Sequence, residues 1–327
     1  MKLALIGGSG HYHYVLSALA ALPHVKLAAF APGSNGEDLG KLRAALAGQS
    51  LAPSQYTDWQ VMLDREQPDL VAVNPHFGDH GAINAECLRR GIHLYAEKPL
   101  ATTLDELDTV EALWRASEVQ LGAMFGIRYK PWFMAAWQAV QAGEIGAVQL
   151  MHAQKSYRLG TRPAFFCERQ RFGGLIPWVG SHAIDWLRWF SGREFVSVSA
   201  MHSSAHNGGH GDLEASAACL FALENGISAT VNIDYLRPAA APSHDDDRLR
   251  VVGSTGIVEV RGQEAWLLNA NGMQALPLAV ETSCFADFVR SIGSNHRCLV
   301  SGEDALRSTR ASLIAREAAD CGQLLKF

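Results

Sequence analysis

The sequence predicts an α/β chain in two parts. Residues 1–123 are expected to form a doubly wound parallel sheet, and residues 124–327 an α+β domain with a large, mostly antiparallel, open sheet. Three observations predict this fold class. A chain of 327 residues is too long for one compact core. The first part alternates short apolar runs with segments of helical period, whereas the second part consists mostly of strand-like runs separated by turns.

In the first part, each short apolar run is followed by apolar residues at helical spacing, which is the pattern of parallel strands with crossover helices. Thr103 is expected to cap one helix, because Glu106 follows three residues later as a capping-box partner. The predicted strands are 3–6, 25–31, 70–73, 93–96 and 119–125, and the other predicted helices are 15–22, 39–46 and 83–90.

In the second part, strand-like runs are separated by turn pairs such as Asn225-Gly226. One helix, Trp178 to Phe190, interrupts the series. A last helix carries Ile314, Ala318, Cys321 and Leu325 at helical spacing, and it is expected to be able to pack back on the first domain. The predicted strands are 147–155, 195–202, 213–223, 227–235, 247–253 and 256–261.

Composition excludes several classes of protein. With 28 basic and 33 acidic residues, the net charge is −5 and no basic block exists, so a nucleic-acid partner is not expected. No apolar run approaches the length of about 18 residues that a membrane span needs. The apolar start is broken by glycines too early for a signal peptide. Six scattered cysteines predict reduced thiols in the cytoplasm, and no metal site is expected.

A glycine-rich segment follows the first predicted strand and opens a helix, where a dinucleotide-binding loop belongs in a Rossmann domain. Its expected cofactor contacts are Gly7, Gly8, Ser9, Gly10, His11 and Tyr12. Neither register of the G-x-G-x-x-G pattern has the last glycine, so a plain tight turn stays an alternative. The second strand ends at Pro32 and Ser34 without an acid for a ribose hydroxyl, and Glu37 or Asp38 comes late. The choice between NAD and NADP therefore stays open.

A series of motifs in order resembles the Gfo/Idh/MocA family of NAD(P)-dependent oxidoreductases, which act mostly on sugars and cyclitols. The marker is the triplet Glu97-Lys98-Pro99 after a strand. The other matching segments are 69–76 with His80, Gly126–Pro131, Glu144–Gly146, Gly173-Gly174, Gly180–Asp185, Val252–Gly256 and Ser301–Ala305. The resemblance spans almost the whole chain and implies further cofactor contacts at Asn74, Pro75, His76, His80, Glu97, Lys98, Pro99 and Arg128.

The resemblance also implies a catalytic pair. Lys98 matches the family lysine that hydrogen-bonds the reacting oxygen of the substrate, and His182 matches the active-site histidine. Asp185 lies three residues further on, on the same helix face, where it can orient the imidazole. In the family's dehydrogenases an aspartate usually precedes this histidine by four residues. Here Trp178 takes that place; it cannot accept a proton, but it can stack on a substrate ring.

Further candidates for substrate contacts are Lys155 and Tyr157, followed by Arg158 and Arg162, at the end of a strand expected near the sheet edge. They can bind hydroxyl groups or a carboxylate, or else serve as surface contacts. Two histidine-containing segments are expected to be exposed polar loops rather than metal sites. These are His202, His206 and His210 with Asp212, and His244 with Asp245–Asp247.

The sequence thus predicts an enzyme that transfers a hydride between NAD or NADP and a small polyhydroxylated substrate, such as a sugar derivative or cyclitol. Two alternatives stay open: a glycosidase-like or lyase-like enzyme with bound NAD, and a non-catalytic nucleotide-binding or sugar-binding protein. A homodimer or homotetramer through the open sheet of the second domain is also expected, because such a face is rarely left exposed.

Overall fold

A computed structural model describes residues 1–278 and 280–327, and it contains two compact units. Unit 1 comprises residues 1–126 and 282–309, and unit 2 comprises residues 127–281 and 310–327. The chain first passes from unit 1 to unit 2 after residue 126, three residues beyond the predicted boundary at 123. Unit 1 also includes a segment near the C-terminus, which the predicted boundary did not include.

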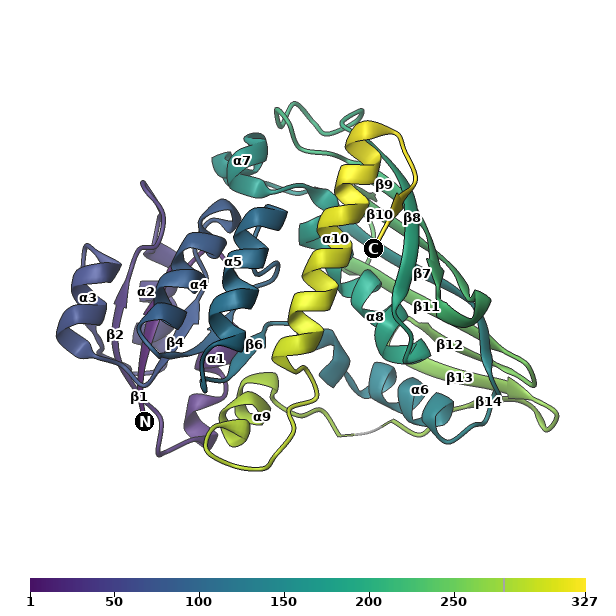
Figure 1. Cartoon of the computed structure of the whole chain (residues 1–327), viewed down its shortest axis with the longest axis horizontal. Coiled ribbons are helices and arrows are strands. Elements are labelled where there is room, and N and C mark those ends of the chain that lie inside the picture. The colour runs from purple at the N-terminus through teal and green to yellow at the C-terminus, as the bar shows by residue number, and fades with distance from the viewer. Residues whose placement is uncertain (279) are drawn as a thin grey trace. The chain divides into compact units, whose positions relative to one another are not determined.

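The core of unit 1 is a six-stranded sheet whose paired strands are all parallel (Figure 1). The strand order is β3-β2-β1-β4-β5-β6, so the chain reverses its direction of progress between β1 and β4. In sheets of this order, ligands bind where the order reverses, beyond the carboxyl ends of the strands. The strands are β1 (Lys2–Ile6), β2 (Lys26–Ala31), β3 (Ser54–Gln55), β4 (Leu70–Val73), β5 (His93–Ala96) and β6 (Leu121–Ala123).

Helices connect these strands, as the alternation predicts. The first helix differs from the prediction over 15–22: α1 spans only His13–Leu16, and a 3-10 turn, Leu19–Ala21, follows it. Thr103 caps α5 as expected, since its side chain accepts a hydrogen bond from the Glu106 amide. The other helices of unit 1 are α2 (Gly40–Gly48), α3 (Trp59–Glu66), α4 (His80–Arg89), α5 (Leu104–Arg115) and α9 (Cys284–Ser291).

Unit 2 is built on a nine-stranded sheet of order β14-β13-β12-β11-β7-β10-β9-β8-β15. Only the β7–β10 pair is parallel, and the other paired strands are antiparallel, which confirms a mostly antiparallel sheet. The strands are β7 (Val148–Arg158), β8 (Phe195–Ser203), β9 (Ser216–Leu223), β10 (Ser228–Arg237), β11 (Asp245–Gly253), β12 (Ile257–Arg261), β13 (Glu264–Asn269), β14 (Gly272–Ala275) and β15 (Leu325–Lys326).

Two predictions about this sheet are wrong. Strand β7, which carries Lys155 and Tyr157, is central rather than near an edge, because β10 and β11 pair with its two sides. Residues Asp245–Asp247 do not form a loop but begin β11, where they pair with residues 155–157 of β7. Three consecutive aspartates predict a loop, because aspartate is typical of turns. In the structure, arginine and lysine side chains neutralise two of them.

Helices cover one face of this sheet. In Figure 1, α6 (Pro131–Gln141) and α8 (Ser181–Ser191) lie on the same side of the nine strands. On β7, Met151, Ala153 and Lys155 are buried, whereas His152 on the other face is exposed. The predicted helix at 178–190 begins differently from the prediction, with a π-helical turn, Ile176–Gly180, before α8. A short helix, α7 (Arg169–Phe172), precedes that turn, and α10 (Gly302–Cys321) belongs to unit 1 up to Thr309 and to unit 2 beyond it. The predicted continuation of this last helix to Leu325 is wrong, because Gly322 has a φ of +66° and Leu325 pairs with β8 as part of β15.

Across residues 1–278 and 280–327, every helix is too short or too polar to traverse a lipid bilayer. The six cysteines are free thiols, and burial raises the pKa of Cys87, Cys219 and Cys284. Neutral, buried thiols of this kind act as small apolar core residues.

Candidate active site

The glycine loop of unit 1 joins β1 to α1 and is tied to the end of β4. Gly7 has a φ of +82°, and a Cβ there would lie 2.3 Å from the Pro75 nitrogen, so only glycine fits. The amides of Ser9 and Gly10 both donate to the Asn74 carbonyl, at 2.8 and 3.0 Å. The sequence-predicted contacts from β1 and β4 therefore meet at the point where the strand order reverses.

Asn74 also presents a buried side chain to this loop. It is 0% exposed, and within the described residues neither its Oδ1 nor its Nδ2 has a hydrogen-bond partner. A Cβ on Gly10 would lie 3.1 Å from that Oδ1. Leaving a buried amide unpaired costs about 1–3 kcal/mol, so such a group usually marks the place of a polar ligand.

Glu97 fastens the other side of the loop. Its Oε2 accepts a hydrogen bond of 2.5 Å from the His11 amide and lies 2.7 Å from His11 Nδ1. Its Oε1 accepts from the Lys98 amide. Burial opposes the charged form, but His11 and Lys98 outweigh it and lower the pKa of Glu97 to about 2. The buried carboxylate is therefore ionised and holds the start of α1, where Tyr12 is the N-cap residue.

Glu37 corrects the expectation that the second strand lacks an acid. Its Oε2 accepts from the amides of Gly33 and Ser34, at 2.9 and 3.3 Å, directly after β2. Its Oε1 accepts from the Gly8 amide and the Ser9 hydroxyl, at 2.9 and 2.6 Å. The chain folds back after β2, so a carboxylate six residues after the strand lies between the strand end and the glycine loop. Because Glu37 comes six residues after β2, spacing in the sequence did not identify it as an acid beside the strand end.

The remaining predicted contacts of unit 1 lie around the same strand ends. The Ser34 hydroxyl accepts from the His76 amide and donates to Asp79, which joins the end of β2 to that of β4. His80 Nδ1 lies 2.7 Å from the Pro99 carbonyl oxygen. Burial lowers the pKa of His80, so its neutral form is favoured, although the Pro99 carbonyl and Glu97 oppose this shift. Pro32 directly follows β2.

Lys98 follows β5 by two residues and is 2% exposed. The peptide bond between Lys98 and Pro99 is cis. Its charge favours the ionised form of Glu97, its neighbour in the chain. A lysine is rarely buried to this degree without a functional reason or a paired charge.

In unit 2, His182 lies in the first turn of α8 and is 4% exposed. Gly180 allows this helix to approach the sheet, because a Cβ there would lie 2.4 Å from the Ile233 side chain on β10. Trp178 belongs to the π-helical turn, and π-helical turns are frequent at functional sites. This turn packs against β10, where burial raises the pKa of Tyr235.

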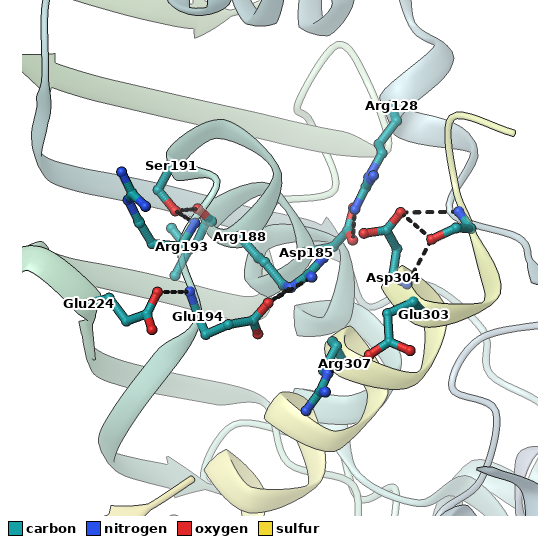
Figure 2. Close-up of polar contacts among 12 residues, drawn as sticks. Arg128, Asp185, Arg188, Ser191, Arg193, Glu194, Glu224, Glu303, Asp304 and Arg307 are labelled. Carbon is teal, nitrogen blue, oxygen red and sulfur yellow. Dashed lines mark hydrogen bonds and ion pairs between the residues drawn. The ribbon is translucent and has the colours of Figure 1, made fainter. Parts of the chain in front are cut away.

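Asp185 and Arg128 form a buried, bidentate ion pair. Arg128 Nε and Nη2 donate to the two carboxylate oxygens at 2.7 and 2.6 Å, and the two side chains are 2% and 1% exposed (Figure 2). The guanidinium also lies over the Trp189 ring. The principal partner of Asp185 is therefore Arg128, which the sequence placed among the cofactor contacts. The roles of Arg128 towards the cofactor and of Asp185 towards His182 stay predictions.

Lys155 and Tyr157 belong to a polar cluster on the helix-covered side of the nine-stranded sheet. Lys155 is 0% exposed, and its Nζ donates to both oxygens of Asp247 at 2.7 Å. Burial lowers the pKa of Lys155, but Asp247 and Tyr157 outweigh it and raise that pKa, so the ammonium stays charged. The Tyr157 ring stacks on His244 at 4.9 Å.

The histidine-rich segment around His202 is partly held by ion pairs. His202 Nε2 lies 3.3 Å from Asp320, and Arg169 pairs with both Asp320 and Glu214. Glu214 also accepts from the Leu175 amide, just before the π-helical turn. Within the residues that the structure describes, no group of three histidine, cysteine or acidic side chains is arranged to hold a metal ion.

Comparison with known proteins gives the same family for both units. Residues 1–125 match the profile described as oxidoreductase family, NAD-binding Rossmann fold, and residues 133–259 match the Gfo/Idh/MocA C-terminal domain. Inositol 2-dehydrogenase 2 of Saccharopolyspora erythraea is 26% identical over 285 residues, which cover 85% of this chain and 78% of that enzyme.

Solved structures agree with this result. A putative oxidoreductase from Thermotoga maritima is 44% identical, with a TM-score of 0.97 and full coverage of both chains. An inositol dehydrogenase homologue from Azotobacter vinelandii, solved with NAD+, is 18% identical and has a TM-score of 0.83, covering 100% of this chain and 97% of that one. At that identity, the second likeness concerns the fold alone.

Proposed function

Because this chain belongs to the Gfo/Idh/MocA oxidoreductase family, we propose that it transfers a hydride between NAD and a small polyhydroxylated substrate, a sugar derivative or cyclitol. The observation that supports this most directly is the loop between β1 and α1. Its glycines are required by close contacts, and it faces the unpaired, buried Asn74 amide at the point where the sheet reverses. The relative named as an inositol 2-dehydrogenase supports the same class of substrate.

The residues present fit a dinucleotide. The loop of Gly7 to Tyr12 would face the pyrophosphate, since glycines let the ligand approach the backbone closely. Glu37 would accept from a ribose hydroxyl, and Asn74 would supply its unpaired amide. When bound, the nicotinamide supplies the hydride acceptor or donor.

The chain itself must handle the substrate oxygen and its proton. We assign this role to Lys98 and His182, of which Lys98 can hydrogen-bond the oxygen and either can exchange a proton with it. Trp178 has no group that can take a proton, so it is assigned to shaping the substrate site. The aspartate usual at that position in the family is thereby replaced by an apolar ring, which leaves proton transfer to the other two residues.

The experiment is a search for NADH formation, followed by absorbance at 340 nm, with myo-inositol, scyllo-inositol, D-glucose and uronic or phosphorylated sugars as probes. We expect turnover of at least one probe. Lys98→Met should lower kcat at least about 100-fold, a larger change than its effect on NADH affinity. Lys41→Met, which removes an exposed lysine from α2, is the matched control. NADH binding without turnover of any probe, or full activity in Lys98→Met, would contradict the proposal.

We also propose a homodimer or homotetramer through the uncovered face of the nine-stranded sheet, in the cytoplasm. Leu150, Met201 and Leu220 lie on that face and are 44%, 70% and 54% exposed. Burying such side chains is favourable by about 25 cal/mol per Å². Leu220→Lys should lower the mass measured by light scattering, whereas Val61→Lys in unit 1 should not. A wild-type monomer would contradict this proposal.

A further inference from the structure

Two arginines at the end of β7 differ from the paired arginines described above. Arg158 Nη1 donates to the Ala239 carbonyl, and Arg162 Nη2 donates to the Arg158 carbonyl. These hydrogen bonds of the two guanidinium groups thus go to neutral backbone oxygens. The Nε of Arg162 is buried and, within the described residues, has no hydrogen-bond partner.

Aromatic rings hold the Arg162 guanidinium in place. Its Cζ lies 4.4 Å from the centroid of the Tyr235 ring and 5.6 Å from that of Phe166. Such a cation–π contact orients the planar group but leaves its N–H donors available for a ligand. A half-buried guanidinium with a buried, unpaired N–H is costly unless an acceptor completes it.

Lys155 does not compete for this role. Both oxygens of Asp247 accept from its ammonium, which also lies over the Tyr157 ring, 4.7 Å from its centroid. The carboxylate that could have neutralised the arginines is therefore committed to Lys155. Asp246 is likewise held by Arg237 and Arg248.

The cluster consequently has an excess of positive charge. Asp246 and Asp247 are each held by basic side chains, whereas Arg158 and Arg162 donate to backbone oxygens. His244 responds to this field: burial lowers its pKa most, and Arg162, Arg158 and Lys155 lower it further, against the opposing effect of Asp245. A neutral imidazole among cations indicates a place that favours an anion.

The position of Arg162 connects it to the proposed chemistry. The Tyr235 ring contacts Arg162 and belongs to β10, against which the π-helical turn that contains Trp178 packs. We propose that Arg162 binds an anionic group, a carboxylate or a phosphate, on the polyhydroxylated substrate, so that the enzyme acts on an acidic sugar or cyclitol derivative. This inference rests on the proposed function. An arginine pairs with a carboxylate or phosphate through two parallel hydrogen bonds, which gives both affinity and orientation.

The test compares neutral and anionic probes that share one carbon skeleton. Binding to NADH-loaded protein is measured by calorimetry for D-glucose, D-glucuronate and D-glucose 6-phosphate, and for D-galactose and D-galacturonate. We expect at least one anionic probe to bind at least about tenfold more tightly than its neutral partner. Arg162→Gln should abolish this preference, so that each anionic probe binds no more tightly than its neutral partner, and Arg162→Lys should retain part of it. Arg193→Gln, which removes an exposed arginine of unit 2, is the control.

Each outcome decides the question. A uronate preference assigns a carboxylate to the site, and a preference for the phosphate ester assigns a phosphate. Equal binding within every pair, or a preference that Arg162→Gln leaves intact, would overturn the inference. The assay measures binding and not turnover. Absence of hydride transfer from every probe would therefore contradict the proposed function but would leave the binding result for Arg162 unchanged. Turnover of neutral polyols alone would retain the proposed function and remove the anionic substrate.

Discussion

Replacement of Glu37 by glutamine tests how the chain distinguishes NAD from NADP. The carboxylate is held by four donors from two loops, so it cannot easily move away from a ligand. A 2′-phosphate placed about 5 Å from it would cost about 3 kcal/mol per pair of unit charges, at an effective dielectric constant of about 20. That cost corresponds to roughly 100-fold in affinity. We therefore expect the wild type to bind NADH far more tightly than NADPH.

Glu37→Gln keeps the shape and removes the charge. The ratio of the two dissociation constants should fall at least about tenfold, because NADPH binds better and NADH loses a charged acceptor for its ribose hydroxyl. Titration by nicotinamide fluorescence measures both constants, and a thermal scan shows whether the loop has stayed folded. Asp38→Asn, at the neighbouring exposed carboxylate that accepts from the Gly40 amide, should leave the ratio unchanged. An unchanged ratio in Glu37→Gln would refute the reasoning.

Three further predictions concern the loop and the buried charges. Gly10→Ala places a Cβ 2.7 Å from the Glu97 carboxylate and should weaken NADH binding at least about tenfold in the same titration, whereas Gly48→Ala, with open space around it, should not. Because the folded pKa of Glu97 is about 2 against an ordinary 4.5, its ionised form stabilises the fold above pH 4.5. The stability difference between wild type and Glu97→Gln, measured by urea unfolding, should shrink as the pH falls from 4.5 towards 2. Asp185→Asn leaves a buried arginine without its carboxylate and should lower the free energy of unfolding in urea by about 3–5 kcal/mol. Glu194→Gln, at the more exposed pair in Figure 2, should lower it by less than about 1 kcal/mol. Equal losses would contradict this prediction.

The sequence was sufficient for the order and type of most strands, because each run has its own period and its own turn residues. The parallel order of unit 1 follows from strand–helix alternation, and the antiparallel pairs of unit 2 follow from short turns such as Asn225-Gly226. Periodicity cannot indicate which strand lies in the middle of a sheet. Strand β7 pairs with β10 and β11, and these partners lie about 80 and 90 residues further along the chain. A central strand therefore looked like an edge strand.

Local motifs in the sequence indicated the candidate residues Lys98 and His182, whereas ion pairs between residues far apart in the sequence were not predicted. The triplet containing Lys98 and the helix containing His182 are local patterns. In contrast, the Arg128–Asp185 pair and the Lys155–Asp247 pair join residues 57 and 92 positions apart. A single sequence carries no signal for such pairs. These distant pairs decide which residue can bind an anion. Because Asp247 pairs with Lys155, we propose Arg162 rather than Lys155 as the anion-binding residue.

The glycine loop shows why the expected pattern failed while its function is still supported. Counting from Gly7 or Gly8 assumes that glycines are needed at fixed positions, but contacts in this fold require them at Gly7 and Gly10. The amides of residues 8–11 are already committed: the first to Glu37, the next two to the Asn74 carbonyl, and the last to Glu97. Under the proposed function, we therefore expect a pyrophosphate to meet the loop near the Tyr12 amide. The two carboxylates fix the loop through its amides, so we expect cofactor affinity to depend on both Glu37 and Glu97.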